Sequence, residues 1–237
     1  MNLDKVLLEL QNAGDSKTQA QYAKTDATYA PYGIRMGALR AIAKNHPIDH
    51  ALALSLIETP ALEARMLAAM IADPKRMDEA SLTRWAKSTA STMFVDQALL
   101  DLILATPYGW SLASQWIQDE SEHLRYAGYQ LYAALFRKEE LSGIPLRLAS
   151  ALLSNIASDL KRETKLVAYA MNNTVVMAGL HVPALETAAR STAEAIGYVE
   201  PLRAKNDCNT QSALDYLNRY GNDPKYSRTA KLKKGSS

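Results

Sequence analysis

Short helical segments, separated by prolines and polar residues, are the feature that most constrains the fold of this chain. Nine prolines are spread over 237 residues. Each can begin or end a helix, because proline lacks an amide N–H and its ring clashes with the preceding turn. Ala and Leu dominate between them, whereas runs of β-branched and aromatic residues are scarce. The pattern predicts an all-α protein, with helices near residues 3–12, 17–25, 34–45, 48–58, 61–72, 77–88, 92–105, 109–118, 120–137, 145–158, 162–178, 184–195 and 210–219.

Helices this short cannot hide an apolar face alone, so they must pack in pairs. Their spacing, roughly one pair per 30 to 40 residues, predicts an α-solenoid of antiparallel helix pairs of the HEAT or armadillo kind over residues 1–220. The second helix of each pair lines the concave wall of such a solenoid. Basic residues at equivalent places would then converge on one curved, basic groove. Four segments set a basic residue beside an apolar stripe: Leu39–Lys44, Glu63–Ala69, His123–Ala127 and Glu163–Tyr169.

The charge of the chain is unevenly distributed. Its formal net charge is +2, from 27 basic and 25 acidic residues. Five of the basic residues follow Asp223, where no acid remains, so we expect residues 221–237 to be a disordered basic tail. The rest carries 22 basic against 25 acidic residues and offers little long-range attraction to nucleic acid. A nucleic-acid partner would therefore require basic residues gathered on one face.

The sequence does not indicate a metal site, a cofactor site or a membrane span. One cysteine and four histidines give neither a disulfide framework nor a zinc-ligand cluster, which suits a reducing, cytoplasmic location. His46 and His50 have the spacing of a metal pair, but Pro47 begins a new helix between them. Asp4 and Glu9 interrupt the N-terminal apolar run, so we expect neither a signal peptide nor a membrane span. We expect no metal and no cofactor; the sequence leaves the oligomeric state open, with a monomer favoured.

Several strings together resemble the DNA alkylation repair family of HEAT-like proteins. The resemblance covers about residues 30 to 220, and it implies a helical solenoid that wraps double-stranded DNA in a basic concave groove. The strings are Tyr32–Lys44, Glu63–Arg65 followed by Leu67–Ala69, Phe94–Gln97, and Met171–Asn173 with Gly179. Ala195–Val199, Cys208, Ala213 and Tyr216 resemble one branch of the family. Met171–Asn173 and Gly197 resemble branches that favour distorted or branched DNA.

The best-known enzymes of that family are glycosylases that remove cationic alkylated purines. Cleavage of the glycosidic bond develops positive charge on the sugar, which a carboxylate can stabilise and aromatic faces can support. The resemblance implies that Asp96 is the catalytic carboxylate. The family's two Trp positions fall on Thr92 and Tyr169, and its Arg position falls on Tyr126, with Arg125 beside it. Three of the four positions thus depart from the catalytic pattern.

The sequence also predicts which residues contact DNA and leaves three functions open. The candidates are a glycosylase, a noncatalytic binder of distorted or branched DNA, and a protein-binding scaffold. Each basic residue has a plainer interpretation as a surface side chain, Asp96 as a helix cap, and Tyr169 as a packing residue. The predicted DNA contacts are Arg35, Arg40, Lys44, Arg65, Arg125, Tyr126, Lys161, Arg162, Lys165, Tyr169 and Asn172.

Overall fold

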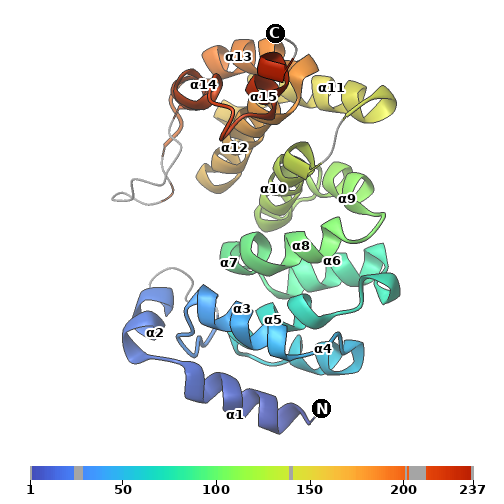
Figure 1. Ribbon diagram of the computed structural model, residues 1–237, viewed down its shortest axis with the longest axis vertical. Coiled ribbons are helices and arrows are strands. Elements are labelled where there is room, and N and C mark those ends of the chain that lie inside the picture. Colours follow the sequence, from blue (N-terminus) through green and yellow to red (C-terminus); the bar gives the residue numbers. More distant parts are fainter. Residues whose placement is uncertain (1, 24–28, 139–140, 201, 203–211, 236–237) are drawn as a thin grey trace. The chain divides into compact units, whose positions relative to one another are not determined.

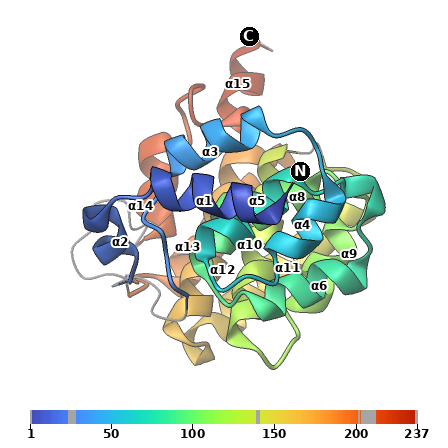
Figure 2. The same cartoon turned by 90° about the horizontal axis from the view of Figure 1, so that it is seen from below.

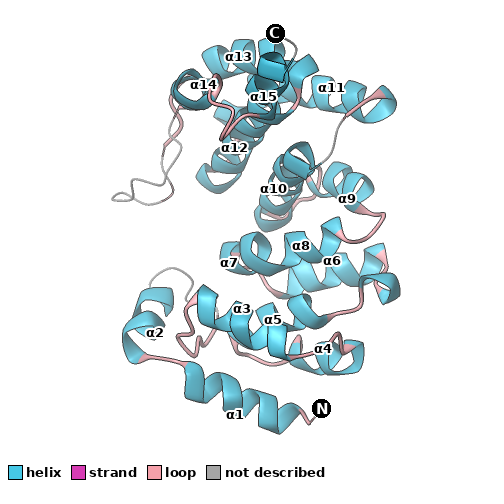
Figure 3. Ribbon diagram, viewed as in Figure 1, coloured by secondary structure: helices cyan, strands magenta, loops and turns pink. Residues whose placement is uncertain are grey.

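The computed structural model describes residues 2–23, 29–138, 141–200, 202 and 212–235 (Figure 1). The chain divides into two compact units, Met1–Tyr108 and Gly109–Ser237. The single repeat domain expected over residues 1–220 stays a prediction. The part of Figure 3 that is described consists of helices and loops without strands, which confirms the all-α prediction. No helix among these residues is long and apolar enough to cross a membrane.

The first unit is organised around one central helix, α5 (Leu62–Ile71), whose residues are mostly buried. Helix α5 contacts α3 and α4, which precede it in the sequence, and the π-helical turn that follows α7. Helix α1 lies over α4 and α5 (Figure 2). Side chains that accept the first amide groups fix the helix starts, as Asp49 does for α4 and Asp78 for α6. The other elements are α1 (Leu3–Ala13), α2 (Ser16–Ala23), α3 (Met36–Asn45), α4 (His50–Leu56), a 3-10 turn (Pro74–Arg76), α6 (Glu79–Ser88), α7 (Thr92–Phe94), the π-helical turn (Val95–Leu99) and α8 (Leu100–Leu104).

The second unit is organised around α12 (Lys165–His181), which packs against α10, α13, α14 and α15. Gly179 permits the approach of α14, because a Cβ there would lie only 2.6 Å from a methyl carbon of Leu217. The other elements are α9 (Gly109–Trp116), α10 (Glu122–Lys138), α11 (Gly143–Asp159), a 3-10 turn (Leu160–Arg162), a second 3-10 turn (Pro183–Leu185), α13 (Glu186–Ile196), α14 (Ala213–Tyr220) and α15 (Arg228–Gly235).

Most of the expected helices are present, with two differences. The helix predicted over 92–105 is interrupted by the π-helical turn. The tail expected to be disordered contains α15, which is docked on α12. The hydroxyl of Ser227 donates to the carbonyl of Leu180 and accepts from the amide of Ala230, each at 3.0 Å. The Ser227 hydroxyl therefore anchors this basic segment to α12. The charge of the segment does not indicate this contact. Cys208 lies outside the described residues.

Candidate nucleic-acid interface

In the first unit, a buried carboxylate holds the loop that leads into α3. Oε1 of Glu63 accepts from the amides of Gly33 (2.8 Å) and Ile34 (3.0 Å), and Oε2 accepts from Tyr32 (2.9 Å). Gly33 has a φ of +85°, and a Cβ there would lie 2.3 Å from the carbonyl oxygen of Asp15. The loop therefore has a fixed path, which sets where α3 begins.

Three of the predicted DNA contacts extend from α3 and its N-cap into solvent. Arg35 has a side chain that is 77% exposed, and its nearest acidic partner, Asp15, is 3.9 Å away. Hydrogen bonds from Thr18 lower the pKa of Asp15, to which Arg35 adds a smaller effect, so this carboxylate stays ionised. Arg40 and Lys44 are exposed and one helical turn apart, which places both on one face of α3.

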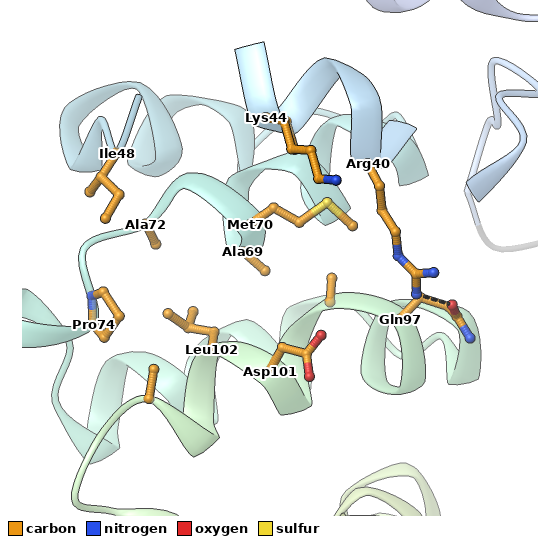
Figure 4. Close-up of a pocket in the computed structure, with 13 residues that line it drawn as sticks. Arg40, Lys44, Ile48, Ala69, Met70, Ala72, Pro74, Gln97, Asp101 and Leu102 are labelled. Atoms are coloured by element: carbon orange, nitrogen blue, oxygen red, sulfur yellow. Dashed lines mark hydrogen bonds between the residues drawn. The ribbon is translucent and has the colours of Figure 1, made fainter. Parts of the chain in front are cut away.

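Arg40 and Lys44 form one wall of an open pocket of about 380 Å³ (Figure 4). The floor is apolar and includes Met70 and Leu102. Gln97 and Asp101, on the π-helical turn and α8, supply the opposite polar edge. A guanidinium nitrogen of Arg40 donates to the side-chain oxygen of Gln97 at 2.9 Å. Three elements far apart in sequence thus meet here: the end of α3, the end of α5 and the start of α8.

Asp96 lies on the π-helical turn, immediately before Gln97. Its side chain is exposed, whereas Val95, Ala98 and Leu99 of the same turn are buried. A π-helical turn contains one residue more than an α-helical turn and is common at functional sites. The geometry therefore presents the Asp96 carboxylate at the surface of the first unit and points the apolar side chains of the turn inward.

In the second unit, two of the predicted DNA contacts, Arg162 and Lys165, are paired with carboxylates. Arg162 is bonded to Asp159, and Lys165 lies 3.4 Å from Glu200. Hydrogen bonds from Ser158 and then Arg162 lower the pKa of Asp159. Lys161 is exposed on the same 3-10 turn as Arg162. Exposed pairs of this kind are weak, so a phosphate can replace the carboxylate at little cost.

Comparison with known proteins places the chain in a family. The model of the DNA alkylation repair enzymes matches residues 3–195. The protein belongs to the DNA alkylation repair family. One solved structure matches this chain with a TM-score of 0.86 and 24% sequence identity. The match covers 97% of this chain and 98% of the other chain. The solved structure comes from a new family of proteins related to the HEAT-like repeat DNA glycosylases, with affinity for branched DNA structures. This likeness confirms the HEAT-like helical fold, whereas no curated protein matches the chain.

Two arginines predicted to contact DNA, Arg65 and Arg125, donate hydrogen bonds to main-chain oxygens of the loops that precede their helices. Arg65 donates to the carbonyl of Thr59 at 2.7 Å, six residues earlier, and to the hydroxyl of Thr89 at 2.8 Å. Arg125 repeats the contact, donating to the carbonyl of Asp119 at 3.0 Å, again six residues earlier, and to Glu163 at 3.1 Å. Because each arginine donates to a main-chain oxygen six residues earlier, both stabilise loops between helices.

The structure corrects two of the expected DNA contacts, Tyr126 and Asn172. Tyr126 is 1% exposed and Asn172 is 0% exposed, so neither side chain reaches a ligand at the surface. The phenol oxygen of Tyr126 accepts from Gln130 at 3.0 Å, and Gln130 in turn accepts from Asn173 at 2.7 Å. These side chains form a polar link between α10 and α12. The sequence predicts a DNA contact at Asn172, whereas the amide that bonds here is the neighbouring Asn173.

The two Trp positions of the family's catalytic pattern are occupied by Thr92 and Tyr169 in this protein. Thr92 is half-buried at the start of α7, and Phe94, the nearest ring in the sequence, is completely buried. Tyr169 is half-buried on α12. The Asp96 carboxylate is exposed, whereas the ring of Phe94 is buried and does not flank it at the surface. Among the described residues, no group of three or more His, Cys, Asp or Glu side chains could hold a metal ion.

Proposed function

We propose that the protein binds double-stranded DNA through phosphate contacts, prefers distorted or branched DNA, and does not excise bases. The observation that carries this proposal is the set of exposed cations at α3, namely Arg35, Arg40 and Lys44, beside the surface that presents Asp96 and Gln97. Arg40 is bonded to a neutral amide and Arg35 only to a distant carboxylate. Their positive charge is therefore available to a polyanion.

The preference for branched DNA is supported by two arguments. The similar solved structure belongs to proteins with affinity for branched DNA structures. In addition, the rings that would surround a lesion are replaced or buried, since Thr92 stands at one position and Phe94 is inaccessible. Phosphate contacts hold a nucleic acid but do not select a base, so recognition would depend on the shape and deformability of the DNA.

Charge neutralisation on α3 tests the binding part of the proposal. We expect Arg40→Gln with Lys44→Gln to weaken binding to a four-way junction and to flatten its dependence on salt. Each lost phosphate contact lowers the slope of log K against log salt by about 0.9, so the pair should lower it by about 1.8. The matched control is Arg84→Gln with Lys87→Gln, which removes the same charge from α6, a helix that does not line the pocket.

The proposal fails if both double variants lower affinity and salt slope equally, since net charge alone would then explain the binding. Equal wild-type affinity for a junction and for a straight duplex of the same length would remove the preference for branched DNA. Titrations by fluorescence polarisation at several salt concentrations provide both measurements.

A glycosylase is the second candidate, and the exposure of Asp96 on the π-helical turn is the observation that favours it. In that case, the protein would release 3-methyl- or 7-methylpurines from alkylated duplex DNA, and Asp96→Asn would abolish release while retaining DNA affinity. Our proposal expects no release from the wild-type protein, under conditions where a known glycosylase acts on the same substrate. Release that depends on Asp96 would make the protein an enzyme.

A further inference from the structure

Three tyrosines gather on α14 and the turn that follows it. The ring centroids of Tyr216 and Tyr220 are 4.5 Å apart, and those of Tyr220 and Tyr226 are 4.9 Å apart. The rings are inclined to each other by 49° and 63°. They therefore form one continuous aromatic group, which we call the α14 tyrosine cluster.

Two cations lie over the rings of this cluster. The guanidinium carbon of Arg219 is 5.2 Å from the centroid of the Tyr220 ring, and the ammonium of Lys225 is 5.2 Å from that of Tyr226. Both side chains are exposed. The neighbouring acid Asp223 accepts from the amide of Lys225 at 2.9 Å, so its carboxylate is engaged in the turn. Asp215 is a further exposed acid, one residue before Tyr216.

The turn that carries Tyr226 is anchored at both ends. At its start, the amide of Gly221 donates to the carbonyl of Leu217 at 2.8 Å. The amide of Tyr226 donates to the carbonyl of Asp223 at 3.0 Å, and Ser227, which follows it, is 1% exposed. The outermost ring is thus held in place before any ligand binds, which lowers the entropy cost of binding.

The cluster is only partly buried. Tyr226 is 42% exposed, and Tyr216 and Tyr220 are half-buried. Burial raises the pKa of Tyr216, so its hydroxyl is neutral at the pH of any binding assay. Half-buried rings with cations over them suit a ligand that offers flat rings and negative charges together. Nucleotides have that chemistry, since bases stack on aromatic side chains while Arg and Lys contact the phosphates.

We propose that the α14 tyrosine cluster, with Arg219 and Lys225, is a stacking surface for unpaired bases of a DNA strand. The proposal rests on the proposed function in taking DNA as the partner, and it deepens it. Branch points and distorted sites expose bases that a straight duplex keeps stacked. A surface of this kind gives the protein a reason to favour such DNA that phosphate contacts alone do not provide.

The test compares two single-stranded probes of equal charge. One is an oligothymidine of about 12 nucleotides, a length within the usual range of single-strand sites, and the other is an abasic strand of the same length. We expect the wild-type protein to bind the oligothymidine at least about fivefold more tightly, as measured by fluorescence polarisation. Tyr226→Ala should remove that preference, whereas Tyr226→Phe should keep it because the ring remains.

Leu148→Ala serves as the matched control, since Leu148 is an apolar side chain of the same unit with 43% exposure. It should leave the preference for bases unchanged. Tyr220→Leu is a second variant that keeps apolar bulk but removes the central ring, and it too should reduce the preference. Thermal melting followed by circular dichroism establishes that each variant is folded before its binding is compared.

Equal wild-type affinity for the two strands would overturn the stacking surface, and so would a folded Tyr226→Ala protein that keeps the preference for bases. A fully paired four-way junction separates this result from the proposed function. If the junction binds and the bases are ignored, only the stacking surface falls. If the oligothymidine binds through Tyr226 and the junction does not, the proposed function falls and the stacking surface stands.

Discussion

Replacing Glu63 by Gln tests how strongly a buried carboxylate holds the loop before α3. Glu63 is 0% exposed and accepts three main-chain hydrogen bonds of 2.8 to 3.0 Å. Gln keeps one side-chain oxygen, which can accept the hydrogen bonds from Gly33 and Ile34. Its NH2 group then faces the main-chain N–H of Tyr32, and two donors cannot form a hydrogen bond. One partly buried donor, the amide of Tyr32, loses its acceptor, at about 1–3 kcal/mol, and two charge-assisted bonds become neutral, at about 0.5–1.5 kcal/mol each.

The neutral side chain recovers part of the cost of burying a charge, so we expect a net loss of about 2–3 kcal/mol. For a chain of this length, that lowers Tm by about 5–10 °C. The measurement is thermal unfolding followed by circular dichroism, with Glu58→Gln as the control because Glu58 is exposed in the same unit. If the two variants melt within about 1 °C of each other, the three hydrogen bonds do not hold the loop as we argue.

Two further predictions concern glycines and a histidine. Gly33→Ala should cost about 2–5 kcal/mol, because φ is +85° and the new Cβ would clash with main-chain atoms, whereas Gly37→Ala, with nothing within 4 Å, should stabilise by about 0.5 kcal/mol; similar urea midpoints for the two variants would contradict this. Burial, with smaller effects from Arg228 and Arg137, lowers the pKa of His181 from 6.5 to about 4. The unfolded chain therefore binds a proton here more readily than the folded one, and stability falls as pH drops from about 6.5 towards 4. His181→Gln should flatten that part of a plot of urea midpoint against pH, and an unchanged plot would show that His181 does not cause the loss.

Local signals in the sequence were sufficient for the helices. Apolar periodicity, prolines and capping residues such as Asp78 act within a few positions, so they predicted most helix ranges. The buried positions of Trp85 and Trp116 also follow from the apolar stripes around them. The resemblance to the alkylation repair family was found in short strings and is confirmed over residues 3–195.

The roles of individual polar residues depended on neighbours distant in sequence. Arg65 and Arg125 have the same type and spacing as surface cations, yet each meets a carbonyl six residues earlier that the loop turns toward it. The pattern of apolar residues did not reveal that Tyr126 would be buried or that Gln130 would join it to Asn173 of α12. That Asp96 and the cations of both units act on one DNA molecule stays a prediction.

Sequence by itself determined which segments become helices and which family they build, because hydrophobic periodicity and helix caps operate within one or two turns of chain. Tertiary structure alone decided which charges remain accessible and which rings meet. The pocket beside Arg40 needs three elements to converge, and the cluster at α14 needs a turn to bring Tyr226 against Tyr220. Accessibility and contact are properties of packing, and packing depends on pairs of residues that no local pattern joins.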